Sequence, residues 1–482
     1  CALPIFCHNA GGTTEKEIRI DVFQLDVPTI SIADADKGFK VLQGSELTIT
    51  PIVDSFLETS YSWQINGEDI SNELTCTLPT IELGEYQVRF ATHNEDGDDE
   101  VTFKVEVCSP DQVDFNWTFL QTEYNMSAGR TIRIKPVDVN NALDAVYTWT
   151  VDNEQVQSGE NDTYLFTSEQ QGEHTVKVEM KNSYILATQT LKVNVCPPAG
   201  TYQRKISATS SASMNKVYEY LPAPGQFINE NHNTTTMAEA CTYAEERINQ
   251  TAYVSLGGFG GYIIVGFDHS IVNDGDYNIA ITGNAFDGSS EPGIVWVMQD
   301  ENGDGLPNDT WYELRGSEYG KAETWQDYAV TYHKPTGIQL PTPWTDNHGQ
   351  SGSIDYLGAF HRQDYYYPAW VKEKQYTLRG TRLKERNYDQ SGNGTYWVND
   401  SYEWGYADNF SAIDRLTDDD NYNAGPSDNH FKISHAVTFD GKDANLKYVD
   451  FIKVQVGVNS KSGWLGEIST EVFGIKDFNM LK

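Results

Sequence analysis

The chain has 482 residues, enough for about three domains of ordinary size, and a single small module is excluded. Acidic residues outnumber basic ones 70 to 34, and the formal net charge of -36 repels phosphate backbones, so nucleic-acid binding is not expected. Aromatic residues make up 12% of the sequence, too many for a disordered acidic chain, and no apolar stretch approaches the roughly 20 residues of a membrane helix.

The first residue, Cys1, is the expected site of a lipid anchor. In bacterial lipoproteins the signal peptide is cleaved before a cysteine that then carries acyl chains. The apolar residues 2–6 precede a second cysteine, Cys7, and could instead end a signal sequence, but Phe6 is a poor residue immediately before an acylation site. We interpret residues 1–25 as a lipoprotein tether and expect membrane contact only through this anchor.

An internal repeat organises the chain up to residue 197. Each copy contains a Tyr-x-Trp run, a Gly-Glu-x-x-Val run and a Lys-Val-x-Val-Cys run. Alternating apolar residues such as Tyr86, Val88 and Phe90 predict half-buried strands. The sequence therefore predicts two tandem immunoglobulin-like sandwiches, at residues 26–108 and 109–197. The matching runs lie at 61–63 and 147–149, 84–88 and 172–176, and 104–108 and 192–196.

A larger domain is expected after the Pro-Pro pair at 197–198, where no regular strand can continue. Residues 198–482 contain many strand-like runs and one helical pattern at 237–248, which opens with the capping-box residues Thr236 and Glu239. This content predicts a jelly-roll-like β-sandwich with one short helix, and an all-β chain overall. The clearest strand-like runs are 261–267, 277–282, 293–298, 448–456 and 468–475.

Four further cysteines lack the C-x-x-C spacing of a zinc site. One of them shares an apolar helical stripe with Met237, Ala244 and Ile248, so a buried free thiol is expected there. Disulfides can form at a cell surface, but the sequence does not choose among the pairings. The four are Cys76, Cys108, Cys196 and Cys241, of which Cys241 lies on the stripe.

An acidic loop begins at residue 300 with the pattern D-x-N-x-D-G. Oxygen side chains at alternate positions of a tight loop converge on a hard cation, and glycine permits the sharp turn, so we expect a structural calcium site. The pattern departs from an EF-hand at position 12, which is Trp311 and not glutamate, and an acidic β-turn without a cation is the alternative. The expected ligands are Asp300, Asn302, Asp304, Asn308 and Asp309.

Aromatic residues are concentrated between residues 356 and 406, which hold 9 tyrosines and 3 tryptophans. Consecutive rings cannot all face one core, because neighbouring side chains of a strand point to opposite faces. We therefore expect an exposed aromatic surface that binds a ligand, with packing inside the fold as the alternative. The expected ligand-binding residues are Tyr365, Tyr366, Tyr367, Trp370, Tyr396, Trp397, Tyr402, Trp404, Tyr406, His361 and Arg362.

Catalytic motifs are missing from the sequence. It contains no G-x-S-x-G elbow, no phosphate-binding P-loop and no H-E-x-x-H metalloprotease motif. A glycoside hydrolase needs only two carboxylates, so that activity stays open in a chain with 70 acidic residues. We nevertheless expect a binding protein and not an enzyme.

Several segments resemble a known family. The Tyr-x-Trp and Gly-Glu runs resemble the PKD-like branch of immunoglobulin-type modules. Four segments of the larger domain are similar to the C-terminal domain of PKD-like cell-surface lipoproteins of gut Bacteroidota, a group that includes the surface cobamide-binding lipoproteins of the BtuH type. These segments are 217–229, 283–293, 300–314 and 466–471.

The resemblance implies a cell-surface lipoprotein of the outer membrane that binds cobalamin or another corrinoid and assists its uptake through a TonB-dependent transporter. It assigns no ligand-binding residue, so the aromatic residues above rest on their density alone. Cobalamin is large, amide-fringed and nearly neutral, which suits aromatic platforms and hydrogen bonds without a basic cluster. A glycan-binding or adhesin-like protein is the alternative, and a glycoside hydrolase is the third possibility.

Overall fold

The computed structural model describes residues 2–9, 11–19, 25–32, 35–55, 57–109, 112, 116–140, 142, 144–182, 185–230, 232–416 and 426–482, and only the backbone of 2–9 and 13–19. The chain divides into two compact units, residues 1–113 and 114–482. Among the described residues, no helix is long and apolar enough to cross a membrane.

The segment interpreted as a tether contains an antiparallel hairpin of β1 (Ala2–Asn9) and β2 (Gly12–Arg19). Cys1 lies outside the described residues, so its lipid anchor stays a prediction.

The first module is a sandwich built around Trp63, whose side chain is fully buried. Its larger sheet has the order β4-β11-β10-β7-β8, and two strand pairs, β5-β9 and β3-β6, complete the module. The alternating apolar residues of β10 and β11 face the core that contains Trp63. The strands are β3 (Thr29–Ser31), β4 (Phe39–Leu42), β5 (Leu47–Ile49), β6 (Ile52–Asp54), β7 (Ser60–Ile65), β8 (Glu68–Ser71), β9 (Cys76–Leu78), β10 (Gly84–Asn94) and β11 (Gly97–Cys108).

The second module repeats this topology, which confirms the predicted tandem sandwiches. Its larger sheet has the order β12-β18-β17-β14-β15, and β13 pairs with β16. Trp149, the counterpart of Trp63 in the Tyr-x-Trp run, is also fully buried. The strands are β12 (Glu123–Ser127), β13 (Thr131–Ile134), β14 (Val146–Val151), β15 (Glu154–Gly159), β16 (Tyr164–Thr167), β17 (Gly172–Lys181) and β18 (Leu186–Cys196).

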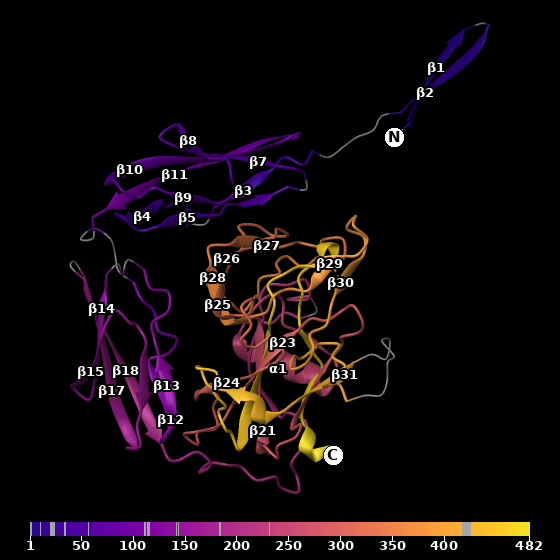
Figure 1. The fold of residues 1–482 in the computed structure, drawn as a ribbon. Coiled ribbons are helices and arrows are strands. Elements are labelled where there is room, and N and C mark those ends of the chain that lie inside the picture. The colour runs from indigo at the N-terminus through magenta and orange to yellow at the C-terminus, as the bar shows by residue number, and fades with distance from the viewer. Residues whose placement is uncertain are drawn as a thin grey trace. The chain divides into compact units, whose positions relative to one another are not determined.

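The terminal domain, residues 198–482, is the larger β-sandwich that the sequence predicts (Figure 1). Its main sheet is antiparallel with the order β19-β21-β33-β23-β24-β32, and smaller sheets run β31-β22-β35 and β27-β26-β25-β28. Two strand pairs, β20-β34 and β29-β30, are attached to these sheets. The main-sheet strands are β19 (Lys216–Leu221), β21 (Tyr262–Val272), β23 (Gly293–Met298), β24 (Trp311–Leu314), β32 (Ala436–Val437) and β33 (Tyr448–Val456).

The remaining strands lie in the smaller sheets and pairs. They are β20 (Val254–Ser255), β22 (Ile279–Gly283), β25 (Trp325–His333), β26 (Thr342–Asp346), β27 (Ser351–Ile354), β28 (Gln375–Arg382), β29 (Asn387–Asp389), β30 (Trp397–Asn399), β31 (Ser427–Phe431), β34 (Glu471–Val472) and β35 (Gly474–Asp477). Short 3-10 turns occur at η2 (Ile433–His435), η3 (Gly463–Leu465) and η4 (Phe478–Met480).

One α-helix of the terminal domain, α1 (Met237–Asn249), starts where the sequence predicts. The side chain of Thr236 accepts a hydrogen bond from the backbone of Glu239, and the Glu239 carboxylate accepts one in return, which forms the expected capping box. Cys241 and Ala244 are buried in the main core beside β19. Cys76, Cys108, Cys196 and Cys241 are buried free thiols, so no disulfide joins any of these four.

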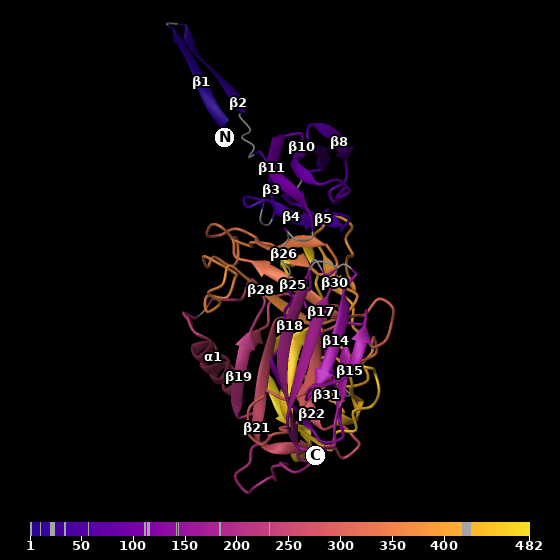
Figure 2. The ribbon, with the colours of Figure 1, turned by 90° about the vertical axis from the view of Figure 1, so that its left-hand side faces the viewer.

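The second module is joined to the terminal domain by a partly buried ionic network, and Figures 1 and 2 show the two lying side by side. Arg130 Nε lies 3.3 Å from Glu301 Oε1, and the Glu301 side chain is only 1% exposed. Ser127 donates its backbone N–H to the other Glu301 oxygen at 3.1 Å. Arg133 and Lys135 both pair with Asp327, at 3.0 and 2.8 Å. The second module and the terminal domain therefore belong to one compact unit.

Substituting Arg130→Ala should destabilise residues 114–482 by about 3 kcal/mol at mildly alkaline pH. Glu301 is ionised there although burial raises its pKa to about 7, and the substitution leaves this buried carboxylate without its cation. Arg89→Ala removes an exposed pair with Glu100 in the first module and should cost less than about 1 kcal/mol. Urea unfolding followed by tryptophan fluorescence compares the two variants. Equal losses would show that the Arg130 contact adds nothing beyond a surface ion pair.

A buried carboxylate in the main sheet makes stability depend on pH. Glu313 of β24 is 5% exposed and accepts a hydrogen bond from Thr381 Oγ1 at 2.6 Å. Burial raises the pKa of Glu313 to about 7, against the opposing effects of that hydrogen bond and of the Lys453 charge. Because the folded state holds the proton more tightly than the unfolded chain, the free energy of unfolding falls as pH rises from about 4.5 to about 7.

We expect Glu313→Gln to remove this part of the pH dependence, which amounts to about 3 kcal/mol at most. The drop in unfolding free energy between mildly acidic and mildly alkaline buffer should therefore be smaller in the variant than in the unsubstituted protein. Urea midpoints measured across this pH range provide the comparison. Identical slopes would mean that Glu313 keeps its ordinary pKa.

Candidate functional site

Five of the aromatic residues expected to bind a ligand are buried, which corrects that part of the prediction. Their hydroxyl and indole groups are hydrogen bonded inside the protein. Burying the rings therefore leaves none of these polar groups without a hydrogen bond. Tyr367 donates to the carbonyl of Glu373 at 2.9 Å, and Tyr402 to that of Lys384 at 2.5 Å. The five, with their exposed fractions, are Tyr366 (1%), Tyr367 (1%), Trp370 (6%), Tyr402 (2%) and Tyr406 (2%).

The other predicted residues are accessible but do not form one site. Tyr365, Trp397 and Trp404 are half-buried, and Tyr396 is 59% exposed. Two predicted polar residues lie near Tyr366: His361 is hydrogen bonded to Glu230 at 2.6 Å, and Arg362 is exposed with its Nε donating to the Gly358 carbonyl. Trp404 lies elsewhere, against His435, with ring centroids 5.1 Å apart.

A pocket of about 240 Å³ lies beside Trp404. Its lining includes Asp414, His430 and His435. The pKa values of both histidines are lowered, chiefly by burial, so these rings are neutral at physiological pH. The volume is below the range of about 300 to 1,000 Å³ that is usual for small-molecule sites. A corrinoid does not fit in this pocket.

Exposed aromatic side chains instead gather where three segments of the terminal domain meet. Phe360 is 66% exposed and Trp464 of η3 is 51% exposed, and their ring centroids lie 6.3 Å apart. The indole of Trp397 lies against Gly463, where a Cβ atom would approach its Nε1 to 2.2 Å. We call Phe360, Trp397, Trp464 and Leu465 the aromatic surface, and the exposed Tyr396 directly precedes Trp397 in the chain.

Hydrogen bonds hold these segments in place. Ser462 Oγ donates to Asn399 Oδ1 at 2.5 Å, and Asn387 Nδ2 donates to the Lys461 carbonyl at 2.7 Å. These bonds connect η3 with the β29-β30 pair. The rings of the aromatic surface are therefore displayed from a fixed frame, which limits the entropy lost when a ligand binds.

Sequence reasoning found part of this surface and missed the rest. Trp397 and the adjacent Tyr396 were predicted, whereas Phe360, Trp464 and Leu465 were not. The signal for Trp464 was its place in the run Gly463-Trp464-Leu465-Gly466, because glycines on both sides favour a tight turn that leaves the ring outside the core.

The acidic loop has the tight shape that its sequence predicts. Asp300 accepts backbone hydrogen bonds from Gly303 at 2.7 Å and Gly305 at 3.0 Å. Asp304 accepts a hydrogen bond from Asn302 Nδ2 and one from Asn308 Nδ2, each at 2.8 Å. The loop thus brings Asn302, Asp304 and Asn308 together, whereas Asp300, Asp304 and Asp309 do not place three carboxylate oxygens within 4.8 Å of one another. Calcium binding stays a prediction.

Burial makes the negative charge of this loop energetically unfavourable. Asp300 and Asp309 are each 4% exposed. Burial, reinforced by the charges of Glu301, Asp300 and Asp304, raises the pKa of Asp309 to about 8, although the backbone N–H of Glu301 donates to it. Asp309 Oδ1 is buried and accepts no hydrogen bond from a described residue. A bound cation would supply the missing positive charge.

Comparisons with known proteins identify the repeated modules. A family model described as a PKD-like domain matches residues 27–94 and 119–182, one segment in each module. No curated protein matches the chain. Each of the two modules therefore contains a segment similar to PKD-like domains.

Solved structures with similar folds contain tandem modules of the same general type. Fibronectin(III)-like modules of Clostridium thermocellum CbhA are 16% identical and cover 37% of this chain and 100% of their own, with a TM-score of 0.19. A chimeric titin Z1Z2 is 20% identical and covers 36% and 98%, with a TM-score of 0.21. With scores this low, the fold assignment rests on the strand pairing and not on these neighbours.

Alanine substitutions should separate the buried from the exposed rings. Tyr366→Ala leaves a cavity in the core and should cost about 3 to 5 kcal/mol. Trp464→Ala should change stability by less than about 1 kcal/mol, because half of the ring is already in water. Chemical denaturation measures both, and a larger loss for Trp464→Ala would contradict the assignment of this ring to the surface.

Proposed function

We propose that this protein is a surface-exposed binding protein, not an enzyme, whose terminal domain captures cobalamin or another corrinoid on the aromatic surface. The observation that carries the proposal is the group of large rings held in water by a hydrogen-bonded frame. Contiguous exposed apolar side chains of this kind mark ligand or partner sites on soluble proteins.

The chemistry of the surface suits a ligand of this class. Phe360 and Trp464 offer apolar faces, and the neighbouring ion pair of Lys461 and Asp355, 2.7 Å apart, offers a donor and an acceptor at the rim. A corrinoid has a broad apolar ring system with amide groups around its edge. Ring faces and rim groups together match that pattern without requiring a cluster of positive charge.

The modules support a role outside the cell. The proposal places the protein on the outer membrane through a lipid on Cys1, with the PKD-like modules as spacers and the terminal domain passing its ligand to a TonB-dependent transporter. The resemblance to surface lipoproteins of gut Bacteroidota is the basis for this location and this partner. The match of both modules to the PKD-like family is consistent with it.

Calcium in the acidic loop belongs to the same proposal. Asp300, Asn302, Asp304, Asn308 and Asp309 would hold it as a structural ion. The backbone carbonyl of Asn308 accepts a hydrogen bond from the second module, from Asn125 Nδ2 at 3.3 Å. A cation in this loop would therefore stiffen the junction between the second module and the terminal domain.

Glycan binding is a second candidate, because the Phe360 and Trp464 rings can stack on sugar faces. Glycoside hydrolysis is less well supported. The carboxylates near the aromatic surface are already engaged, Asp355 with Lys461 and Glu230 with His361. A glycosidase needs a pair of carboxyl groups free to act on the scissile bond.

Calorimetric titration with cyanocobalamin tests the proposal. The double variant Phe360→Ala/Trp464→Ala should bind at least about tenfold more weakly than the unsubstituted protein, because it removes both central rings. Trp404→Ala, a tryptophan outside the aromatic surface, should leave the affinity unchanged.

Two results would reject the corrinoid proposal. One is a protein that does not bind cyanocobalamin, and the other is an affinity that the double variant leaves unchanged. Parallel titration with an oligosaccharide panel distinguishes the second candidate, since binding of a sugar that is lost in the same double variant would assign the surface to glycans.

A further inference from the structure

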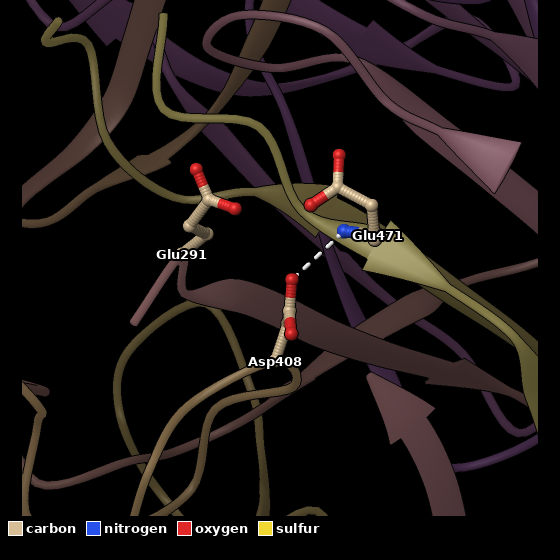
Figure 3. A group of neighbouring side chains, drawn as sticks. All are labelled: Glu291, Asp408 and Glu471. Atoms are coloured by element: carbon tan, nitrogen blue, oxygen red, sulfur yellow. Dashed lines mark hydrogen bonds between the residues drawn. The ribbon is translucent and has the colours of Figure 1, made fainter. Parts of the chain in front are cut away.

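Three carboxylates that belong neither to the aromatic surface nor to the acidic loop converge inside the terminal domain (Figure 3). They come from Glu291 just before β23, Asp408 in a loop, and Glu471 of β34. One oxygen from each lies within 4.8 Å of the others. Asp408 is 1% exposed and Glu471 is 4% exposed. Figure 3 shows Glu291 and Glu471 turned toward each other beside Asp408.

The backbone fixes this convergence. Asp408 Oδ1 accepts hydrogen bonds from the N–H groups of Asn284 and Ala285, both at 2.8 Å. Asp408 Oδ2 accepts the N–H of Glu471 at 2.9 Å, and the Asp408 carbonyl accepts the N–H of Glu291 at 2.9 Å. The three acidic residues therefore hold one another in place through main-chain contacts.

Close packing at Gly283 also depends on this arrangement. A Cβ atom at Gly283 would lie 2.5 Å from Asp408 Oδ1 and 2.8 Å from its Cα atom. Asp408 itself has a φ of 52°, a left-handed conformation that is uncommon for a residue other than glycine. Backbone strain of this kind is typical of functional sites, where the surrounding structure enforces it.

The three negative charges have no cationic partner. In the described part of the chain, no lysine, arginine or histidine forms an ion pair with Glu291, Asp408 or Glu471. Burial raises the pKa of Glu291 to about 7, and burial and the neighbouring carboxylates raise the pKa values of Asp408 and Glu471 above their ordinary range. Backbone N–H groups donate to the Asp408 carboxylate and, from Ser469 at 3.3 Å, to Glu291. Three buried carboxyl groups without a cationic partner nevertheless need protons or a cation to offset their charge.

One buried oxygen points to a cation. Glu471 Oε1 is buried and accepts no hydrogen bond from a described residue, although the side chain is directed into the cluster. Asn284 does not add to this requirement, because its amide nitrogen faces Asp408 and donates to the two carboxylate oxygens over 3.0 and 3.3 Å.

We propose that Glu291, Asp408 and Glu471 form a site for a divalent cation, with Ca²⁺ as the ion that fits best. All the available ligand atoms are oxygens, which excludes the nitrogen and sulfur preference of zinc. Calcium binds oxygen at about 2.3 to 2.6 Å, so two of its ligands can lie about 5 Å apart, which agrees with the spread of the three carboxylates. Magnesium requires shorter distances of about 2.0 to 2.1 Å.

A cation here would tie three segments that are distant in sequence. Glu471 pairs with Ser255 in the β20-β34 pair, and Glu291 lies directly before β23 of the main sheet. The site would therefore stabilise the domain from within. It does not depend on the corrinoid proposal or on calcium in the acidic loop, because it shares no residue with either.

The test is a calcium-dependent melting curve of the full chain after treatment with a chelator. The unsubstituted protein should gain about 3 to 8 °C in Tm when CaCl₂ is added at about 100 times its Kd. Glu471→Gln and Glu291→Gln remove one charge without changing the side-chain shape, so they should lose most of this gain and melt higher than the unsubstituted protein in the chelator.

Two further variants serve as controls. Glu313→Gln neutralises another buried carboxylate and should leave the calcium-dependent gain unchanged. Asp304→Asn alters the acidic loop, and a gain that survives in this variant belongs to the carboxylate cluster. Calorimetric titration with CaCl₂ should show one bound ion fewer in Glu291→Gln than in Glu313→Gln.

The inference is overturned if the gain in Tm is absent, or if it persists in both cluster variants. If Glu471→Gln does not fold, Glu291, which is only partly buried, provides the deciding variant, and its calcium stoichiometry replaces the melting curve. A stoichiometry equal to that of Glu313→Gln would mean that the cluster holds protons and not a cation. Loss of cyanocobalamin binding alone would leave the result on calcium unaffected.

Discussion

The terminal domain depends on how it compensates the negative charge that it buries. Asp450, with no exposed surface, accepts hydrogen bonds from Arg204 and Ser270, and the buried His269 lies 2.9 Å from Asp477. Glu301 is compensated across the junction with the second module, by Arg130. Each of these pairs links segments far apart in sequence. In an acidic chain the placement of its few cations therefore determines which segments can come together.

The architecture could be predicted from local patterns. Trp63 and Trp149 occupy matching positions of a repeat, and each sandwich buries its tryptophan because alternating side chains define an inner face. The start of α1 could be predicted from the capping box at Thr236 and Glu239, because all the interacting groups lie within one turn. Strand β33 could also be predicted, because six of its nine residues are apolar, and the strand is buried on both faces.

The candidate sites could be predicted only in part. The density of aromatic residues in a sequence does not show whether each ring points into the core or into solvent. Tyr402 and Tyr406 point into the core, where their hydroxyl groups form hydrogen bonds with the backbone. Trp464 was not predicted because it lies outside the aromatic-rich segment of residues 356–406. The cluster of Glu291 and Glu471 brings together residues 180 positions apart, and no local pattern encodes such a meeting. The acidic loop, which is local, took the shape that its spacing predicted.

The parallel pairing at the edge of each module has a mechanical consequence. In both sandwiches an early strand lies parallel to the last one, β4 beside β11 and β12 beside β18. A force that pulls the two ends of such a module apart acts along these strands, so it loads the hydrogen bonds between them in shear and all at once. In antiparallel strands joined at one end, the same force would break the hydrogen bonds between the strands one after another. Each module should therefore resist tension applied along the chain better than a module whose end strands are antiparallel.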